Sequence, residues 1–175
     1  MKNKPFLMLV LGLPGAGKST FTKTLKPEMF PMPRLVINVD DIRLAYGHVY
    51  KEELEPAVMR YAHSVTVEAL CRRQTVIVDE CLTSRSEARV FASAATLYGA
   101  DLVMVEIDAD PTECLVRRAA TGFPLSAWAM KYDAWVAKRE RILSLADVHI
   151  KITNPEDMEA YHEFHKERFP ALAAH

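Results

Sequence analysis

The stretch from Phe6 to Ser19 constrains the fold more than any other part of the chain. Phe6 to Leu11 is a continuous apolar run, as expected for a central parallel strand that is covered on both faces. The run leads directly into Gly12-Leu13-Pro14-Gly15-Ala16-Gly17-Lys18-Ser19, a full match to the pattern GxxxxGK followed by Ser or Thr. The sequence therefore predicts a strand, a phosphate-binding loop and a helix in succession.

The chemistry of this loop suits a nucleoside triphosphate. Glycines let the backbone curl so that its amides point inward at phosphate oxygens, and the positive end of the following helix faces the same anion. Lys18 would reach the β- and γ-phosphates, and the Ser19 hydroxyl would bind Mg²⁺. We therefore expect ATP and Mg²⁺ as cofactors, although no base-reading residue distinguishes ATP from GTP. The expected nucleotide contacts are Pro14, Gly15, Ala16, Gly17, Lys18, Ser19 and Thr20.

Strand and helix patterns alternate along the rest of the chain, which predicts an α/β fold with a parallel sheet wrapped on both sides. Further strands are expected at 35–39, 75–78, 102–107 and 148–152, and helices at 41–46, 52–73, 84–98, 111–120, 125–145 and from 154 to about 168. The 175 residues suit one domain, 1–175. Ligands of such sheets bind at the carboxyl ends of the strands, so the loop, Asp40, Asp79 and Asp108 should lie along one rim. Periodicity alone does not give the strand order.

Composition narrows the class of protein. The net charge is −1, so a broad basic face for nucleic acid is not expected, although a local basic pocket is compatible with this value. The three cysteines have no metal-type spacing and no disulfide framework, which indicates a reducing compartment. No later stretch approaches the roughly 20 apolar residues of a membrane span. We read the apolar N-terminal run as a buried strand rather than a secretory signal, and expect a cytoplasmic protein without membrane partners.

The stretch LVINVDDIR supplies the groups that a kinase needs at its acceptor. Asp40 follows the second strand, 22 residues after Lys18, and a carboxylate there can remove the proton from an acceptor hydroxyl. Arg43 is one helical turn further on, where it can fork onto a phosphate or carboxylate of the acceptor. The alternative is that Asp40 or Asp41 only caps the short helix. Beside a phosphate loop we favour Asp40 as general base.

Two further segments bear on the reaction. VIVDE, residues 76–80, is typical of ATPases, in which the aspartate holds Mg²⁺ and the glutamate activates water. Arg117 and Arg118 come late in a helix and precede Thr121-Gly122-Phe123-Pro124, which predicts a mobile lid around 117–128. A cation on that lid can stabilise the transferred phosphoryl group. Both arginines can instead be solvated or favour the negative end of their helix.

The stretches GLPGAGKST, VINVDDIR, TVIVDECLTSRSEAR and DADPTECLVRRAATG together resemble the kinase domain of bacteriophage polynucleotide 5′-hydroxyl kinase and the zeta-toxin-like, AAA_33-type P-loop kinases. The resemblance implies a three-layer sandwich with a five-stranded parallel sheet, the P-loop nucleoside-triphosphate hydrolase (kinase-like) fold. It also implies Lys18 on the donor phosphates, Asp40 as general base, Arg43 as an acceptor-phosphate or positioning contact, Asp79 on the acceptor side and Arg117 as the lid arginine.

The chain departs from this pattern in three places. The relatives usually have asparagine where this chain has Arg118, a second lid arginine near Thr121, and D-x-N where this chain has Asp79-Glu80-Cys81. Whether Arg118 replaces the missing arginine is left open. The first choice of function is an ATP-dependent phosphotransferase acting on a polynucleotide 5′-hydroxyl. The alternatives are a small-molecule kinase for a nucleotide sugar, nucleoside, antibiotic or modified base, and an ATPase or nucleotide-binding module. The oligomeric state is not predicted.

Overall fold

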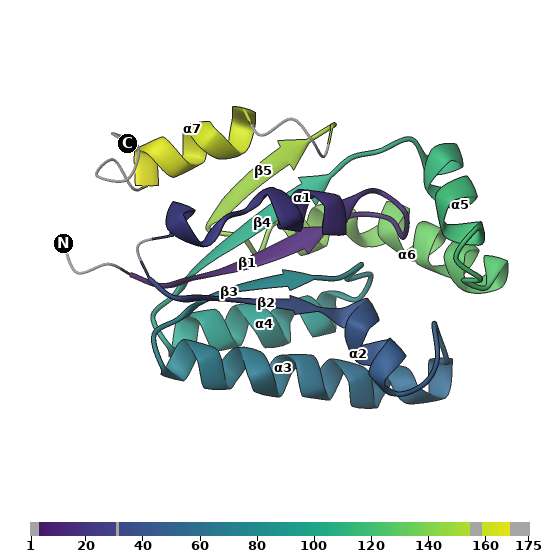
Figure 1. The fold of residues 1–175 in the computed structure, drawn as a ribbon, viewed down its shortest axis with the longest axis horizontal. Helices are drawn as coiled ribbons and strands as arrows, with labels where there is room; N and C mark the ends of the chain where they lie inside the picture. Colours follow the sequence, from purple (N-terminus) through teal and green to yellow (C-terminus); the bar gives the residue numbers. More distant parts are fainter. Residues whose placement is uncertain (1–3, 31, 155–158, 169–175) are drawn as a thin grey trace.

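The computed structural model describes residues 4–30, 32–154 and 159–168, and its centre is a five-stranded sheet (Figure 1). The strands lie in the order β2-β3-β1-β4-β5, and each neighbouring pair is parallel. The strands are β1 (Phe6–Leu11), β2 (Arg34–Asn38), β3 (Thr75–Asp79), β4 (Asp101–Ile107) and β5 (Val148–Ile152). The predicted five-stranded parallel sheet is thereby confirmed.

The apolar run of β1 is buried because β1 is the middle strand. All six residues of β1 are inaccessible to solvent, and the strand pairs with β3 on one side and β4 on the other. The five residues of β3 are buried as well, whereas β2 lies at the sheet edge and exposes part of Val36. The pattern of continuous burial in the centre and partial exposure at the edge is that of a sheet covered on both faces.

Helices cover both faces and complete the three layers. In Figure 1, α3 (Glu55–Cys71) and α4 (Arg85–Leu97) lie below the sheet, and α1 (Lys18–Thr24) and α7 (Glu159–Arg168) lie above it. The long helix α6 (Leu125–Leu143) contacts α4 and α5. The shorter elements are α2 (Val39–Ala45), α5 (Pro111–Ala119) and two 3₁₀ turns, η1 (Pro27–Met29) and η2 (Glu52–Leu54). The P-loop, α2 and α5 all lie at the carboxyl ends of the strands.

Most predicted boundaries hold to within a few residues, and the differences have local causes. The helix expected at 41–46 begins at Val39, because the Asn38 side chain accepts hydrogen bonds from the amides of Asp40 and Asp41. The helix expected at 52–73 is divided into η2 and α3, with Pro56 in the first turn of α3. The predicted start of the last helix falls partly outside the described residues, and α7 is observed from Glu159.

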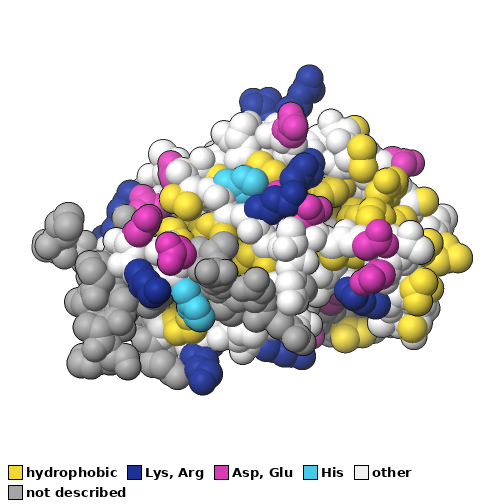
Figure 2. Space-filling view, turned by 90° about the horizontal axis from the view of Figure 1, so that it is seen from above, with side chains coloured by type: hydrophobic (Ala, Val, Ile, Leu, Met, Phe, Trp, Pro, Cys, Tyr) yellow, Lys and Arg dark blue, Asp and Glu magenta, His cyan; other side chains and the backbone are white. Residues whose placement is uncertain are grey.

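The surface agrees with the near-neutral composition. On the face seen in Figure 2, described Lys and Arg side chains are interspersed with Asp and Glu, and they form no continuous basic area there. In the part of the chain that the structure describes, no helix combines the length and apolar character needed to cross a bilayer. Trp128 and Trp135 of α6 are buried in the core, as expected for a packed helix face.

Candidate active site

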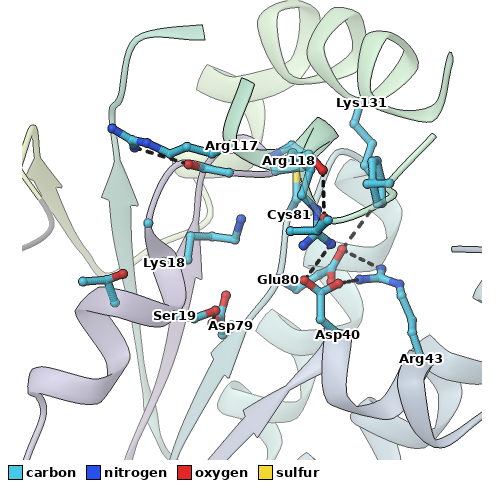
Figure 3. A pocket seen from close by; sticks show the side chains of 16 residues that line it. Lys18, Ser19, Asp40, Arg43, Asp79, Glu80, Cys81, Arg117, Arg118 and Lys131 are labelled. Atoms are coloured by element: carbon cyan, nitrogen blue, oxygen red, sulfur yellow. Dashed lines mark hydrogen bonds and ion pairs between the residues drawn. The ribbon is translucent and has the colours of Figure 1, made fainter. Parts of the chain in front are cut away.

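A cavity of about 270 Å³ opens at the carboxyl ends of β1 and β3 (Figure 3). Its walls come from the P-loop, α1, α2, the end of β3, α5 and α6. The lining residues are Pro14, Gly15, Gly17, Lys18, Ser19, Thr20, Asp40, Arg43, Asp79, Glu80, Cys81, Arg117, Arg118, Thr121, Phe123 and Lys131. Charged side chains of both signs therefore share one small volume.

The P-loop needs glycine at two positions because neighbouring backbone comes very close. Gly12 has φ +147° and Gly15 has φ +91°, conformations that other residues rarely adopt. A Cβ atom on Gly12 would lie 2.5 Å from the carbonyl oxygen of Ile107, and one on Gly15 would lie 2.2 Å from that of Cys114. Gly15 therefore lets α5 approach the loop. No side chain caps the start of α1, which follows Gly17, so a phosphate can bind the helix amides there.

Ser19 and Asp79 form the polar floor of the pocket. The Ser19 hydroxyl donates to Asp79 Oδ2 over 2.6 Å, and the Asn38 side-chain amide lies 3.3 Å from the same carboxylate oxygen. Burial raises the pKa of Asp79 above its usual value, against the lowering effects of Lys18 and Ser19. Lys18 Nζ donates to the carbonyl oxygens of Gly12 and Leu13, at 3.2 and 3.0 Å.

These oxygens fit a magnesium ion in the usual arrangement of nucleotide enzymes. Mg²⁺ takes few protein ligands and completes its shell with water and phosphate oxygens. Among the described residues, no group of three or more His, Cys, Asp and Glu side chains could hold a metal alone. The hydroxyl of Ser19 and the carboxylate of Asp79 would therefore contribute to an ion that a nucleotide also ligates.

Asp40 lies in the first turn of α2, and each of its carboxylate oxygens contacts an arginine. Arg43 Nη1 donates to Oδ1 and Arg118 Nη2 donates to Oδ2, both over 2.7 Å. Arg118 also lies over the ring of Phe123, with its guanidinium carbon 4.6 Å from the ring centroid. The two arginines hold Asp40 at the wall of the pocket that Lys18 also lines (Figure 3).

Arg43 also donates hydrogen bonds to two further carboxylates, those of Glu55 and Glu80. Its Nε and Nη2 atoms donate to the two oxygens of Glu55 at 2.8 and 2.7 Å, and Nη2 also reaches Glu80 Oε1 at 3.1 Å. Arg43 is only 3% exposed. Because its donors are taken by side chains of this protein, the geometry favours the positioning role over direct contact with an acceptor.

Glu80 is the buried centre of this charge network. Burial alone would raise the pKa of Glu80, but Arg43 and Lys131 outweigh it and hold the pKa at about 2. Lys131 Nζ lies 3.6 Å from Glu80 Oε1. Glu80 is therefore an ionised counter-charge, and a carboxylate with such a low pKa is a poor base.

The segment expected to form a lid comprises the end of α5, a turn and the start of α6. Arg117 is half-exposed, pairs with Glu113 at 2.6 Å, and places Nη1 3.5 Å from the carbonyl oxygen of Gly15. Trp128 Nε1 donates to the carbonyl oxygen of Pro14 over 3.0 Å, which ties α6 to the P-loop. Arg117 thus faces the loop and Arg118 faces Asp40.

Nearly all the side chains singled out from the sequence meet in this pocket. Ala16 is the exception within the loop, because it is fully buried behind the pocket wall. Asp108 follows β4 but pairs with Lys151, and it does not line the pocket. Sequence reasoning missed Asn38 and Lys131. The helix-capping preference of asparagine could have indicated Asn38, whereas Lys131 had no sequence signal because it lies in the middle of a long helix.

Comparison with known proteins identifies the family of the chain. A family model, AAA_33 (AAA domain), matches residues 7–127. L-seryl-tRNA(Sec) kinase of Methanococcus maripaludis is 29% identical over 114 residues, which is 64% of this chain and 44% of that relative. The chain thus matches less than half the length of this curated relative.

Solved structures share the fold at low sequence identity. A gluconokinase from Sinorhizobium meliloti 1021 has a TM-score of 0.60 at 18% identity, and the match covers 99% of this chain and 94% of that chain. A chain of the Pnkp1/Rnl/Hen1 complex has a TM-score of 0.55 at 24% identity, over 67% of this chain and 40% of its own. The fold is that of P-loop kinases.

Proposed function

The chain belongs to the AAA_33 family, and we propose that it is an ATP-dependent kinase that transfers the γ-phosphoryl group to a hydroxyl acceptor. The observation that carries the proposal is the position of Asp40, which lines the same pocket as the P-loop residues Lys18 and Ser19. A donor site and a carboxylate base on neighbouring elements are the two parts that phosphoryl transfer to an alcohol requires.

The P-loop would hold the donor. Bound MgATP supplies the phosphoryl group and its leaving group. Lys18 would turn from the carbonyl oxygens of Gly12 and Leu13 towards the phosphates, and the amides at the start of α1 would bind them. Ser19 and Asp79 would contribute oxygen ligands to the Mg²⁺ ion.

Asp40 would act on the acceptor. Its carboxylate accepts the proton of the acceptor hydroxyl as that oxygen bonds to phosphorus and the bond to the ADP oxygen breaks. Arg43 keeps the carboxylate in place. The segment 117–128 would close over the phosphates, with Arg117 stabilising the charge on the transferred group.

Glu80 argues against the ATPase alternative. A water-activating glutamate needs a carboxylate that faces the phosphates and can accept a proton. Glu80 is instead 4% exposed, contacts Arg43 and Lys131, and has a pKa of about 2. The geometry therefore supports transfer to an alcohol over transfer to water.

For the acceptor we retain the polynucleotide 5′-hydroxyl as first choice. It is supported by the fold shared with a chain of the Pnkp1/Rnl/Hen1 complex. The name of the similar L-seryl-tRNA(Sec) kinase specifies a seryl-tRNA substrate, which supports an RNA-linked acceptor but not the 5′-hydroxyl itself. A small-molecule hydroxyl is the second choice, because the match to the gluconokinase covers 99% of this chain and 94% of that chain.

The test is incubation with labelled ATP and a panel of hydroxyl acceptors, followed by identification of the labelled product. Asp40→Asn should lower the transfer rate by a factor on the order of 100 or more and leave ATP binding unchanged, because only the base is lost. Asp41→Asn is the matched control, since Asp41 lies in the same helical turn but is exposed.

Each other outcome selects a different function. Near-normal transfer by Asp40→Asn would remove the base assignment. Phosphate release at the same rate with and without every acceptor would favour the ATPase. Nucleotide binding without turnover would favour a nucleotide-binding module.

A further inference from the structure

Lys131 is a buried cation that the reaction outlined above does not use. It projects from α6 into the pocket and is 9% exposed (Figure 3). Its one ion-pair partner among the described residues is Glu80, at 3.6 Å, which is beyond hydrogen-bonding distance. The same Glu80 oxygen already accepts from Arg43 at 3.1 Å.

Among the described residues, three other cations of the pocket donate hydrogen bonds to groups of the protein, and Lys131 does not. Lys18 donates to loop carbonyls, Arg43 to three carboxylates, and Arg118 to Asp40. Lys131 has three N–H donors and no hydrogen bond to any described residue. Its ammonium group lines the pocket and therefore keeps donors that a ligand there can use.

The surroundings of Lys131 favour an anion as that ligand. Lys131 Nζ lies over the ring of Tyr50, 5.5 Å from the centroid, and Tyr50 packs against Phe123 with ring centroids 5.3 Å apart. Arg118 lies on the other ring of this aromatic pair. Two cations thus flank a small apolar platform, where the low dielectric strengthens attraction to a negative group.

We propose that Lys131 binds an anionic group carried by the acceptor, either a phosphate or a carboxylate. This inference rests on the proposed kinase function. Lys131 and Asp40 line the same small cavity, so an anion at Lys131 and the reacting hydroxyl at Asp40 would belong to one molecule. The acceptor is therefore an acidic alcohol, and neutral sugars and nucleosides are poor substrates.

Matched acceptor pairs test the inference during turnover. Thymidine 3′-phosphate against thymidine tests a phosphate, and gluconate against glucose tests a carboxylate. In at least one pair the wild type should show a KM at least tenfold lower for the charged member. Lys131→Met should abolish that preference without changing the KM for ATP, and Lys131→Arg should restore it. Lys138→Met, an exposed lysine on the same helix, should behave as wild type.

A binding measurement separates this inference from the kinase proposal. The protein is saturated with Mg²⁺ and β,γ-imido-ATP to fill the donor site, and the thermal midpoint is followed as inorganic phosphate is added. Phosphate should raise the midpoint of the wild type and of Lys138→Met but not of Lys131→Met. No rise in the wild type, or an equal rise in Lys131→Met, overturns the anion site even if transfer to some neutral alcohol is found. A Lys131-dependent rise supports it even if no acceptor in the panel is phosphorylated.

Discussion

At the scale of single residues, the question is how Asp40 becomes available as a base. Each of its oxygens accepts one hydrogen bond from an arginine, which leaves a further lone pair on each for an acceptor hydroxyl. Arg43 is held by Glu55 and Glu80 as well and cannot leave without breaking those pairs. Arg118 pairs with Asp40 alone among the described residues, so it can turn towards the transferred phosphoryl group more easily than Arg43 can.

We predict that substitutions of Arg117 and Arg118 have different kinetic effects. Arg118→Ala should lower kcat on the order of 10- to 100-fold and leave the KM for ATP unchanged, because it acts at Asp40 and the transferred group. Arg117→Ala should lower kcat and also raise the KM for ATP, because Arg117 faces the P-loop at Gly15. Steady-state kinetics with each substrate varied separately provides the measurement. Identical changes in both variants would contradict the division of roles.

At the scale of elements, the helix that carries both arginines is placed by its contact with the P-loop. Pro111 begins α5 and the Asp110 side chain caps it, accepting from the amides of Thr112 and Glu113. The backbone at Cys114 then packs on Gly15. Helix α5 and the P-loop are therefore in direct contact, so a shift of α5 changes the position of both arginines.

Two glycines with positive φ separate the effect of the contact between Gly15 and Cys114 from the effect of backbone strain. Gly15→Ala should lower the free energy of unfolding by roughly 2–3 kcal/mol and weaken ATP binding, because its Cβ would meet the Cys114 carbonyl oxygen at 2.2 Å. Gly99 has φ +64°, and a Cβ added there would have nothing within 4 Å. Gly99→Ala should therefore lower the free energy of unfolding by only about 1 kcal/mol and leave ATP binding unchanged. Chemical unfolding and nucleotide titration measure both quantities. Equal losses would show that α5 does not depend on this contact.

Adjacent residues predict the elements of this fold, but they do not predict the contacts between distant elements. The apolar runs of β1 and β3 and the glycine pattern of the loop predicted their elements well, because burial and positive φ are properties of adjacent residues. The pairing of Asp40 with Arg118 and of Glu80 with Lys131 joins residues far apart in the chain. These pairs depend on the strand order and on the packing of α6, which periodicity does not contain.

For the whole molecule, one charge network links the elements around the pocket. Glu80 at the end of β3 contacts Arg43 of α2 and Lys131 of α6, and Arg43 contacts Glu55 of α3. The network fixes the relative positions of helices that approach the sheet from different parts of the chain. Its stability should therefore follow the ionisation of Glu80.

Ionised Glu80 should stabilise the folded protein at neutral pH and lose this effect in acid. The pKa of Glu80 falls from 4.5 to about 2 on folding, so its stabilising contribution is complete above pH 4.5 and is lost as the pH falls towards 2. Glu80→Gln should be less stable than wild type by on the order of 3 kcal/mol at neutral pH. That difference should shrink steadily below pH 4.5, because the unfolded wild type then takes up a proton at Glu80 while the folded protein, with its lower pKa, does not.

Chemical unfolding at several pH values between 7 and 3 measures this difference. Glu68→Gln is the matched control, since Glu68 pairs with Arg72 on the exposed face of α3 and such pairs contribute about 0–1 kcal/mol. Its effect should be small at every pH. A Glu80→Gln variant whose deficit stays constant down to pH 3 would show that the carboxylate stabilises the fold by shape and packing, and that the charges of Arg43 and Lys131 are balanced elsewhere.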